Sequence, residues 1–455
     1  MTSTSSSSSS SSAASSSSSG SVACSPTWSK GFPVTSSSNL AYGAANKVAV
    51  DGAGNVAIGG VLLGSVDLGL GQITATGNYG SVLAAELDCT GRPLWNHVFG
   101  TAQNGSDATN GLAVDGTGAV LLTGQFSDTI DFGCGVLTSQ AADGFVARLD
   151  GAGNCLWSKR FGGAFSGDAG LAIAADAAGN VLVAGTFSGT TDFGGGSVTS
   201  SGSQPALFLL KLDAAGSFVW VKQFGAAGPS ASMTLDASAN VLLCGSGGDL
   251  DFGGGVVSGG PLFLAKLDAS GNFVWGNALG TPVGSTMTCT GIAAGAQGDF
   301  VIGGSYSAAT DLGVGPLPAS QGAGSVGGYV ARFKSTGTIA FSVGNAGSGT
   351  TTVPAVALDA LGNTFVTGAF DTALSFGGPT RVSAGGQDVF VVQLSPTGAF
   401  TSSSTFGDTS AQFGSGVAVT PLGAPVIVGG YLGVLDFGNG ALTTVTPSSP
   451  FVARL

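Results

Sequence analysis

Apolar residues in this chain occur in short runs of four to seven, and each run ends at glycine, aspartate or asparagine. Runs of this length that are rich in Val, Leu and Phe are typical of strands buried on both faces. None approaches the roughly 20 apolar residues that a membrane-spanning helix needs. The pattern therefore predicts an all-β protein without a transmembrane segment.

A three-residue marker, Asp-Phe-Gly or a close variant of it, recurs along the chain. Its copies begin at Asp67, Asp131, Asp192, Asp251, Asp311, Ser375 and Asp436. Subtraction gives successive spacings of 64, 61, 59, 60, 64 and 61 residues. Such regularity indicates seven copies of one structural unit.

Each repeat contains four predicted strands, named A to D in chain order. In the second repeat they cover residues 112–114, 120–123, 145–149 and 156–161. The A–B and C–D connections are Asp-x-x-Gly turns, in which Asp caps the turn and Gly takes a positive φ. The longer B–C segment carries the marker. Four antiparallel strands per repeat are the signature of a β-propeller blade.

The repeats predict one propeller domain over residues 24–455, preceded by a disordered Ser-rich tether over residues 1–23. The blades are expected at 46–100, 111–162, 170–225, 231–280, 289–345, 353–407 and 414–455. The last blade lacks strand D, because the chain ends in its strand C, Phe451 to Leu455. Residues 27–32 contain an unassigned segment, Trp28 to Phe32, which matches Trp157 to Phe161. We therefore expect a seven-bladed β-propeller of four-stranded antiparallel blades, closed by an N-terminal strand that completes the last blade.

These motifs resemble the bacterial seven-bladed β-propeller repeat family, often labelled SBBP. The third repeat shows the family pattern well, at Asp176 to Asn180, Asp192 to Gly194, Phe208 to Asp213 and Trp220 to Gly225. The resemblance covers residues 27–455, although Phe341 and Ser402 replace the expected Trp in the fifth and sixth repeats. It implies a propeller fold and a cell-surface or secreted protein, and it implies no particular activity.

Charge and cysteine content narrow the choice of compartment and partner. Only 8% of the residues are charged, the net charge is −12, and the basic residues do not cluster, which argues against nucleic acid and anionic membranes. The six cysteines are far apart, which disfavours a zinc site and is compatible with an oxidising compartment, with their pairing left open. No signal peptide follows Met1, so we expect either a cytoplasmic protein or, preferably, a natural start further upstream. The favoured location is extracellular or at the cell surface, with the N-terminus as a membrane tether.

The residues offer little support for catalysis, a cofactor or a metal. The lone histidine, His97, stands where other repeats carry Lys159 or Lys222, so we interpret it as an ordinary outer-strand residue. A Ser-His-Asp triad would need that histidine, and a glycosidase would need paired carboxylates, whereas Glu86 is the single glutamate. The Asp-x-x-Gly-Asn turns lack the ligand spacing of a calcium loop. We therefore expect a non-enzymatic protein without a cofactor.

The fourth residue of strand C is long and polar in every repeat. These residues are Glu86, Arg148, Lys211, Lys266, Arg332, Gln393 and Arg454. Our hypothesis is that the marker aspartates form structural pairs with them: Asp131 with Arg148, Asp192 with Lys211, Asp251 with Lys266, Asp311 with Arg332, and Asp436 with Arg454. In the first repeat Asp67 faces Glu86, so a neighbour such as Lys47 would have to supply the positive charge. The alternative is a ring of ligand-binding acids.

Topology predicts where a ligand would bind. The B–C segments and D–A connections share one rim and vary between repeats, and variable loops on a rigid scaffold tend to carry function. Candidate ligand-facing residues there are Asn104, Asp107 and Asp168. We expect an interaction or structural module with an unknown protein or glycan partner. The alternatives are a carbohydrate-binding or carbohydrate-active propeller and a calcium-dependent adhesion module.

Overall fold

The computed structural model describes most of the repeat region. It covers residue 24 and residues 27–35, 42–76, 79–100, 107–164, 167–200, 204–247, 249–280, 286–319, 321–345 and 348–455. The predicted tether, residues 1–23, lies outside the described residues. Every regular element of the described residues is a β-strand, as the hydrophobic pattern predicted. None of these residues belongs to a helix that is long and apolar enough to cross a membrane.

Each repeat folds into four antiparallel strands, which we call a unit. Unit 1 contains β2 (Tyr42–Val50), β3 (Val56–Leu63), β6 (Ser81–Leu87) and β7 (Pro93–Phe99). Unit 2 contains β8 (Ala108–Val114), β9 (Val120–Asp131), β10 (Val136–Leu149) and β11 (Cys155–Phe161). Unit 3 contains β12 (Ala169–Ala175), β13 (Val181–Phe187), β16 (Ala206–Leu212) and the first part of β17 (Phe218–Leu235). The second part of β17 pairs with β18, so this long strand also begins unit 4.

Units 4 to 7 continue the same order. Unit 4 continues with β18 (Val241–Gly247), β21 (Leu262–Leu267) and β22 (Phe273–Leu279), and unit 5 contains β23 (Gly291–Ala294), β24 (Phe300–Tyr306), β25 (Gln321–Phe333) and β26 (Ile339–Gly344). Unit 6 contains β27 (Ser348–Leu358), β28 (Thr364–Phe370), β31 (Asp388–Leu394) and β32 (Phe400–Phe406). Unit 7 contains β33 (Gln412–Val419), β34 (Pro425–Asp436), β35 (Ala441–Arg454) and β1 (Trp28–Gly31). Small two-stranded hairpins extend four B–C segments: β4 (Ser65–Asp67) with β5 (Gln72–Thr74), β14 (Thr190–Asp192) with β15 (Ser197–Thr199), β19 (Leu250–Asp251) with β20 (Val256–Val257), and β29 (Ala373–Leu374) with β30 (Arg381–Val382).

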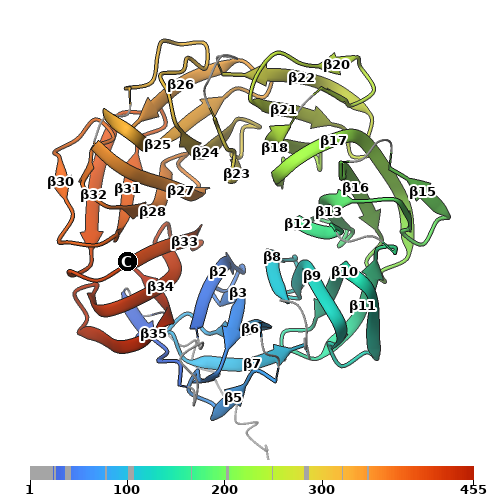
Figure 1. Ribbon diagram of the computed structural model, residues 1–455, viewed down its shortest axis with the longest axis horizontal. Coiled ribbons are helices and arrows are strands. Elements are labelled where there is room, and N and C mark those ends of the chain that lie inside the picture. The colour runs from blue at the N-terminus through green and yellow to red at the C-terminus, as the bar shows by residue number, and fades with distance from the viewer. Residues whose placement is uncertain are drawn as a thin grey trace, which may run out of the picture.

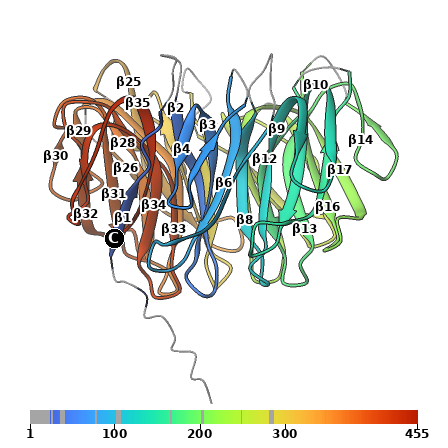
Figure 2. The ribbon, with the colours of Figure 1, turned by 90° about the horizontal axis from the view of Figure 1, so that it is seen from below.

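The units follow one another around a central axis, which is the arrangement of a β-propeller (Figure 1). The first strand of each unit lies nearest the axis, as β2, β8, β12 and β33 show, and the later strands lie progressively further out. The strands run between two rims (Figure 2). The A–B and C–D turns lie at one of them, the turn rim. The B–C segments and D–A connections meet at the other, the connection rim.

The hydrophobic core is divided among the interfaces between neighbouring units. The marker aromatic residue supplies much of this packing: Phe193 stacks on Phe161 of the preceding unit at 5.6 Å and lies 4.8 Å from Phe208 of its own unit, measured between ring centroids. One cluster joins the two ends of the chain, because it combines Val426, Val428 and Val452 with residues of unit 1 such as Val56 and Ile58. The last unit therefore packs on the first as other neighbours pack on each other.

The strand pairing that we predicted between the two chain ends is present. β1 pairs antiparallel with β35, with Trp28 opposite Arg454 and Gly31 opposite Phe451. Trp28 is buried, and its indole Nε1 donates a hydrogen bond of 3.2 Å to the carbonyl of Cys89 in the C–D turn of unit 1. That contact extends to a covalent one, because Cys24 and Cys89 form a disulfide. The N-terminal segment thus joins units 7 and 1.

The other four cysteines also pair. Cys134 and Cys155 form a disulfide within unit 2, and Cys244 and Cys289 join β18 of unit 4 to the segment before β23 of unit 5. No free cysteine remains in the chain, since all six positions lie within the described residues.

Candidate functional site

The predicted pairs between marker aspartates and strand C are wrong. Arg148 forms its ion pair with Asp115 of the A–B turn, at 2.5 Å, and not with Asp131. The reason is the register: Arg148 lies opposite Leu121 and Asp131 lies opposite Val136, which puts them at opposite ends of the β9–β10 hairpin. In three further units the strand C residue also forms its ion pair with the aspartate of the A–B turn. Lys211 pairs with Asp176, Lys266 with Asp236, and Arg332 with Asp299. Asp192, Asp251, Asp311 and Asp436 are likewise outside these pairs.

The basic residue of strand C also connects neighbouring units. The Nζ of Lys211 donates to the carbonyl of Ala269 at 3.2 Å, and an Nη of Arg332 donates to the carbonyl of Gly362 at 2.6 Å, each in the next unit. Arg148 makes the same contact with the carbonyl of Ala214. A single side chain thus neutralises a turn aspartate and holds the adjacent unit, which is a structural role.

The marker aspartate caps its own loop. The Oδ1 of Asp131 accepts hydrogen bonds from the backbone N–H groups of Gly133 and Gly135, at 2.7 and 3.1 Å. Both glycines adopt positive φ values, 100° and 112°, which a residue with a side chain rarely adopts. Asp67, Asp192, Asp251 and Asp311 accept the same two bonds, and Asp436 accepts the first of them. These exposed carboxylates are therefore engaged with backbone groups.

Units 1, 6 and 7 lack this ion pair at strand C, and in unit 6 the residue there is the uncharged Gln393. In unit 1, Glu86 accepts a 2.8 Å hydrogen bond from the indole of Trp95, and burial, together with the nearby charge of Asp51, raises its pKa. Lys47 does not balance it, so that expectation is wrong, because Lys47 lies on the innermost strand β2. In unit 7, Thr420 stands at the first turn position, and Arg454 donates instead to the carbonyl of Cys89 at 3.1 Å.

The proposed rim residues do not face a ligand where the structure describes them. Asp107 and Asp168 are 0% and 1% exposed. The carboxylate of Asp168 accepts hydrogen bonds from the backbone N–H groups of Gly163 and Ser188, and Asp107 accepts one from Ser127. Burial raises the pKa of Asp168. Both carboxylates are therefore buried and bound to backbone N–H groups of neighbouring loops. Asn104 lies outside the described residues.

His97 occupies the outer strand of unit 1, as its place in the repeat predicted. It lies between Trp95 and Phe99 on β7, with ring centroids 5.6 and 5.4 Å away. Burial lowers the pKa of His97 below its usual value. Its surroundings are those of a packed side chain on the strand.

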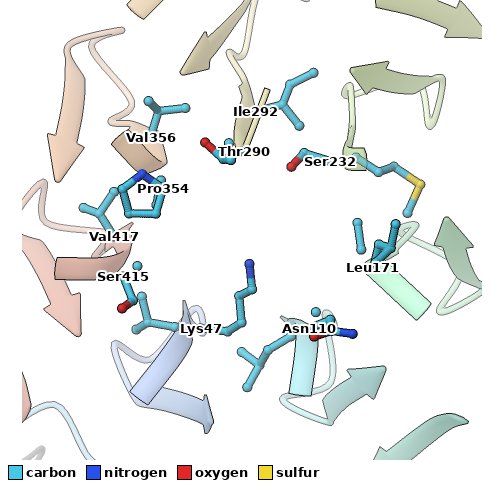
Figure 3. Close-up of a pocket in the computed structure, with 18 of the residues that line it drawn as sticks. Lys47, Asn110, Leu171, Ser232, Thr290, Ile292, Pro354, Val356, Ser415 and Val417 are labelled. Atoms are coloured by element: carbon cyan, nitrogen blue, oxygen red, sulfur yellow. The ribbon is translucent and has the colours of Figure 1, made fainter. Parts of the chain in front are cut away.

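A cavity of about 350 Å³ lies in the central channel, lined by the innermost strand of every unit. Its wall includes Asn110, Leu171, Ser232, Thr290, Pro354 and Ser415, which surround the opening in Figure 3. A second cavity of about 150 Å³ continues along these strands and is lined also by Ile173, Met233 and Ile292. Ligand sites in proteins usually occupy about 300–1,000 Å³, so this channel suits a small molecule.

Lys47 lines both cavities, and Figure 3 shows its amine directed into the opening. It is the single charged side chain among the residues that line them. No hydrogen-bond or ion-pair partner contacts its Nζ within the described part of the chain. Burial lowers the pKa of Lys47, since a charged amine here has lost water without gaining a counter-ion. Among the described residues, the site therefore presents an amine without a counter-ion.

The sequence suggested Lys47 only as a counter-charge in the first repeat and not as a channel residue, although the repeat contains a signal for that position. Lys47 lies opposite Gly59 in the β2–β3 register, and the equivalent positions of the other units hold small residues: Gly111, Ala172, Ser232, Gly291, Ala355 and Gly416. A Cβ added at Gly111 would lie 3.1 Å from the Cα of Ala172, which shows how closely neighbouring innermost strands approach. A long cation at this position is an exception to the repeat.

Comparisons with known proteins add a general likeness. No family model matches the chain, and no curated protein matches it. Similar solved structures include the WD40 β-propeller domain of Doa1 (10% identity, TM-score 0.43, covering 93% of this chain and 96% of that one) and Sqt1 from Chaetomium thermophilum (11%, 0.43, 86% and 95%). Another is a protein of unknown function from Bacteroides caccae (13%, 0.34, 70% and 94%). The fold assignment rests on the strand pairings of this chain.

Proposed function

We propose that the units form a closed ring of seven blades of the SBBP type, which acts as a non-enzymatic interaction module outside the cytoplasm. The observation that carries this proposal is the double connection of the chain ends, through the β1–β35 pairing and the Cys24–Cys89 disulfide. A strand pairing and a disulfide between the chain ends would make the units a rigid support for the irregular loops of the connection rim. Disulfides persist in oxidising compartments, so the three bridges support a secreted or cell-surface location.

The connection rim is the binding face in this proposal. Tyr79, at the end of the B–C segment of unit 1, is 55% exposed, and its carbonyl accepts a hydrogen bond from the hydroxyl of Tyr42. Tyrosine is enriched at protein interfaces because it combines a large apolar area with a polar tip. The turn rim instead repeats the same capped hairpin from unit to unit. A partner that reads differences between units would bind at the connection rim.

Photo-crosslinking in the natural host tests this proposal. Benzoylphenylalanine replaces Tyr79 on the connection rim in one variant and Leu422, which is 81% exposed on the turn rim, in the matched control. We expect a defined covalent adduct from position 79 and none from position 422. Adducts from position 422 alone would contradict the assignment of the binding face.

Glycan binding is a second candidate, favoured by the same exposed ring of Tyr79. Sugars stack on aromatic faces, and an exposed tyrosine supplies one. A glycan array probed with the native protein and with Tyr79→Ala distinguishes this candidate, which requires a signal that the substitution removes.

A further inference from the structure

The central channel combines one cation with neutral hydrogen-bonding groups. The hydroxyl of Ser232 faces the cavity (Figure 3), Ser415 also lines it, and neither hydroxyl has a hydrogen-bond partner within the described residues. The hydroxyl of Thr290 donates to the carbonyl of Val353 at 2.6 Å, so its proton is already engaged. The serine hydroxyls are therefore the candidate donors that share the channel with the amine.

The remainder of the wall mixes amide and hydroxyl groups, such as those of Asn46 and Asn110, with apolar side chains, and no carboxylate is among the described residues that line it. Leu171 and Pro354 line the wider cavity, and Met233, Ile292 and Val417 line the narrower one. A bound molecule would thus meet a positive charge at one end and hydrocarbon along its body. Since Lys47 supplies a single charge, a monoanion would neutralise it, whereas a dianion would leave one negative charge unbalanced in the channel.

We propose that the central channel binds a small monocarboxylate, whose carboxylate group contacts Lys47 and whose carbon body lies against the apolar wall. The hydroxyls of Ser232 and Ser415 would donate to the carboxylate oxygens. This site rests on the ring of the proposed function and does not depend on a partner at its rim.

Isothermal titration calorimetry with acetate, butanoate and benzoate at constant ionic strength tests the proposal. We expect saturable binding of at least one carboxylate at one site per chain, and weaker binding of inorganic phosphate. Lys47→Met keeps the length of the side chain and removes its charge, and it should weaken the binding at least tenfold. The control variant Lys334→Met changes an exposed lysine of the unit 5 C–D turn and should bind as the native protein does.

Three results would overturn the proposal: the absence of saturable binding by all three carboxylates, equal binding by Lys47→Met, or tighter binding of phosphate than of every carboxylate. Thermal melting first establishes that the variants are folded. If Lys47→Met does not fold, Lys47→Ala replaces it, since alanine occupies the equivalent positions Ala172 and Ala355. Failure here leaves the crosslinking result at the rim unaffected, so the two proposals fail separately.

Discussion

At the scale of single residues, the charged side chains of the repeat have two separate structural roles. The marker aspartate caps a loop at the surface, and the strand C cation pairs with the aspartate of the A–B turn. Arg148 and Asp115 are both buried, so removing one partner leaves an unpaired charge out of contact with water. The energetic cost should therefore depend on which aspartate is changed.

A double-mutant cycle tests this division. Arg148→Met should destabilise the protein by about 3–5 kcal/mol, because it leaves the carboxylate of Asp115 buried without its partner. Adding Asp115→Asn should recover part of that loss, so the two effects couple. Urea denaturation of the single and double variants measures the coupling energy.

Asp131→Asn is the matched control, since Asp131 is the partner that the sequence pattern suggested. Its carboxylate binds backbone N–H groups only, so its effect should be small and additive with Arg148→Met. Strong coupling of Arg148 to Asp131, rather than to Asp115, would show that the pairing described here is incorrect.

Glu86 gives a prediction about pH. Its pKa is raised by burial and by Asp51, so the folded protein holds this proton more tightly than the unfolded chain does. The native protein therefore loses stability as pH rises from the ordinary glutamate pKa through the raised value. Glu86→Gln cannot ionise and keeps an acceptor for Trp95. Its gain in unfolding free energy over the native protein should be near zero at about pH 4, the ordinary glutamate range, and should grow as the pH rises through the raised pKa of Glu86.

Unfolding free energies of both proteins across this pH range check the prediction. Gln393 already fills the same position in unit 6, which makes glutamine a compatible replacement. A difference between the two proteins that does not change with pH would contradict the assigned charge state.

At the scale of elements, β1 is the strand that completes the last unit, and the proposed ring would depend on it. It is short, but it places Trp28 against the C–D turn of unit 1, where a Cβ added at Gly91 would lie 2.7 Å from the indole. Trp28→Ala should cost about 3–5 kcal/mol, as for other buried tryptophans. Trp157→Ala, which removes the equivalent Trp of β11, is the comparison within the chain. Thermal or urea unfolding measures both.

Truncations separate the strand from what precedes it. Deletion of residues 1–23 should leave the melting temperature nearly unchanged. Deletion of residues 1–33 removes β1, the buried Phe32 and one half of the Cys24–Cys89 bridge, and it should lower the melting temperature strongly. Equal melting of the two truncated proteins would disprove the closing role of β1.

The elements themselves could be predicted from the sequence because their signals are local. Alternating turn residues and apolar runs located the strands, and the match of Trp28 to Phe32 with Trp157 to Phe161 identified the missing strand. Partners across a hairpin could not be predicted in this way. Asp131 and Arg148 recur together in the repeat, yet the pattern does not say that the B–C segment carries them to opposite ends of the strands.

The candidate site could not be predicted from the sequence for a related reason. Lys47 has no special neighbours in the sequence, and its meaning depends on the alignment of innermost strands that places it among Gly111, Ala172 and other small residues. The rim aspartates show the opposite error. Asp107 and Asp168 resemble ligand-facing acids in a loop, but the fold buries them beneath it.

At the scale of the whole molecule, the strand pairing of the chain ends and a shared apolar cluster join the last unit to the first. Each unit packs on the next through apolar side chains, and the cluster around Val452 and Val56 does the same between the last unit and the first. Without that interface, two units would expose their inner faces to water. The contact between the last unit and the first therefore buries the same kind of apolar surface as the other contacts between neighbouring units.

Disulfide mapping of the native protein by mass spectrometry of unreduced peptides tests this closure most directly. The pairing of β1 with β35 holds Cys24 beside Cys89, so this bridge is expected when the N-terminal segment lies between the last and the first units. We predict the bridges Cys24–Cys89, Cys134–Cys155 and Cys244–Cys289, with no free thiol. A free Cys24, or Cys24 joined to any cysteine other than Cys89, would contradict it.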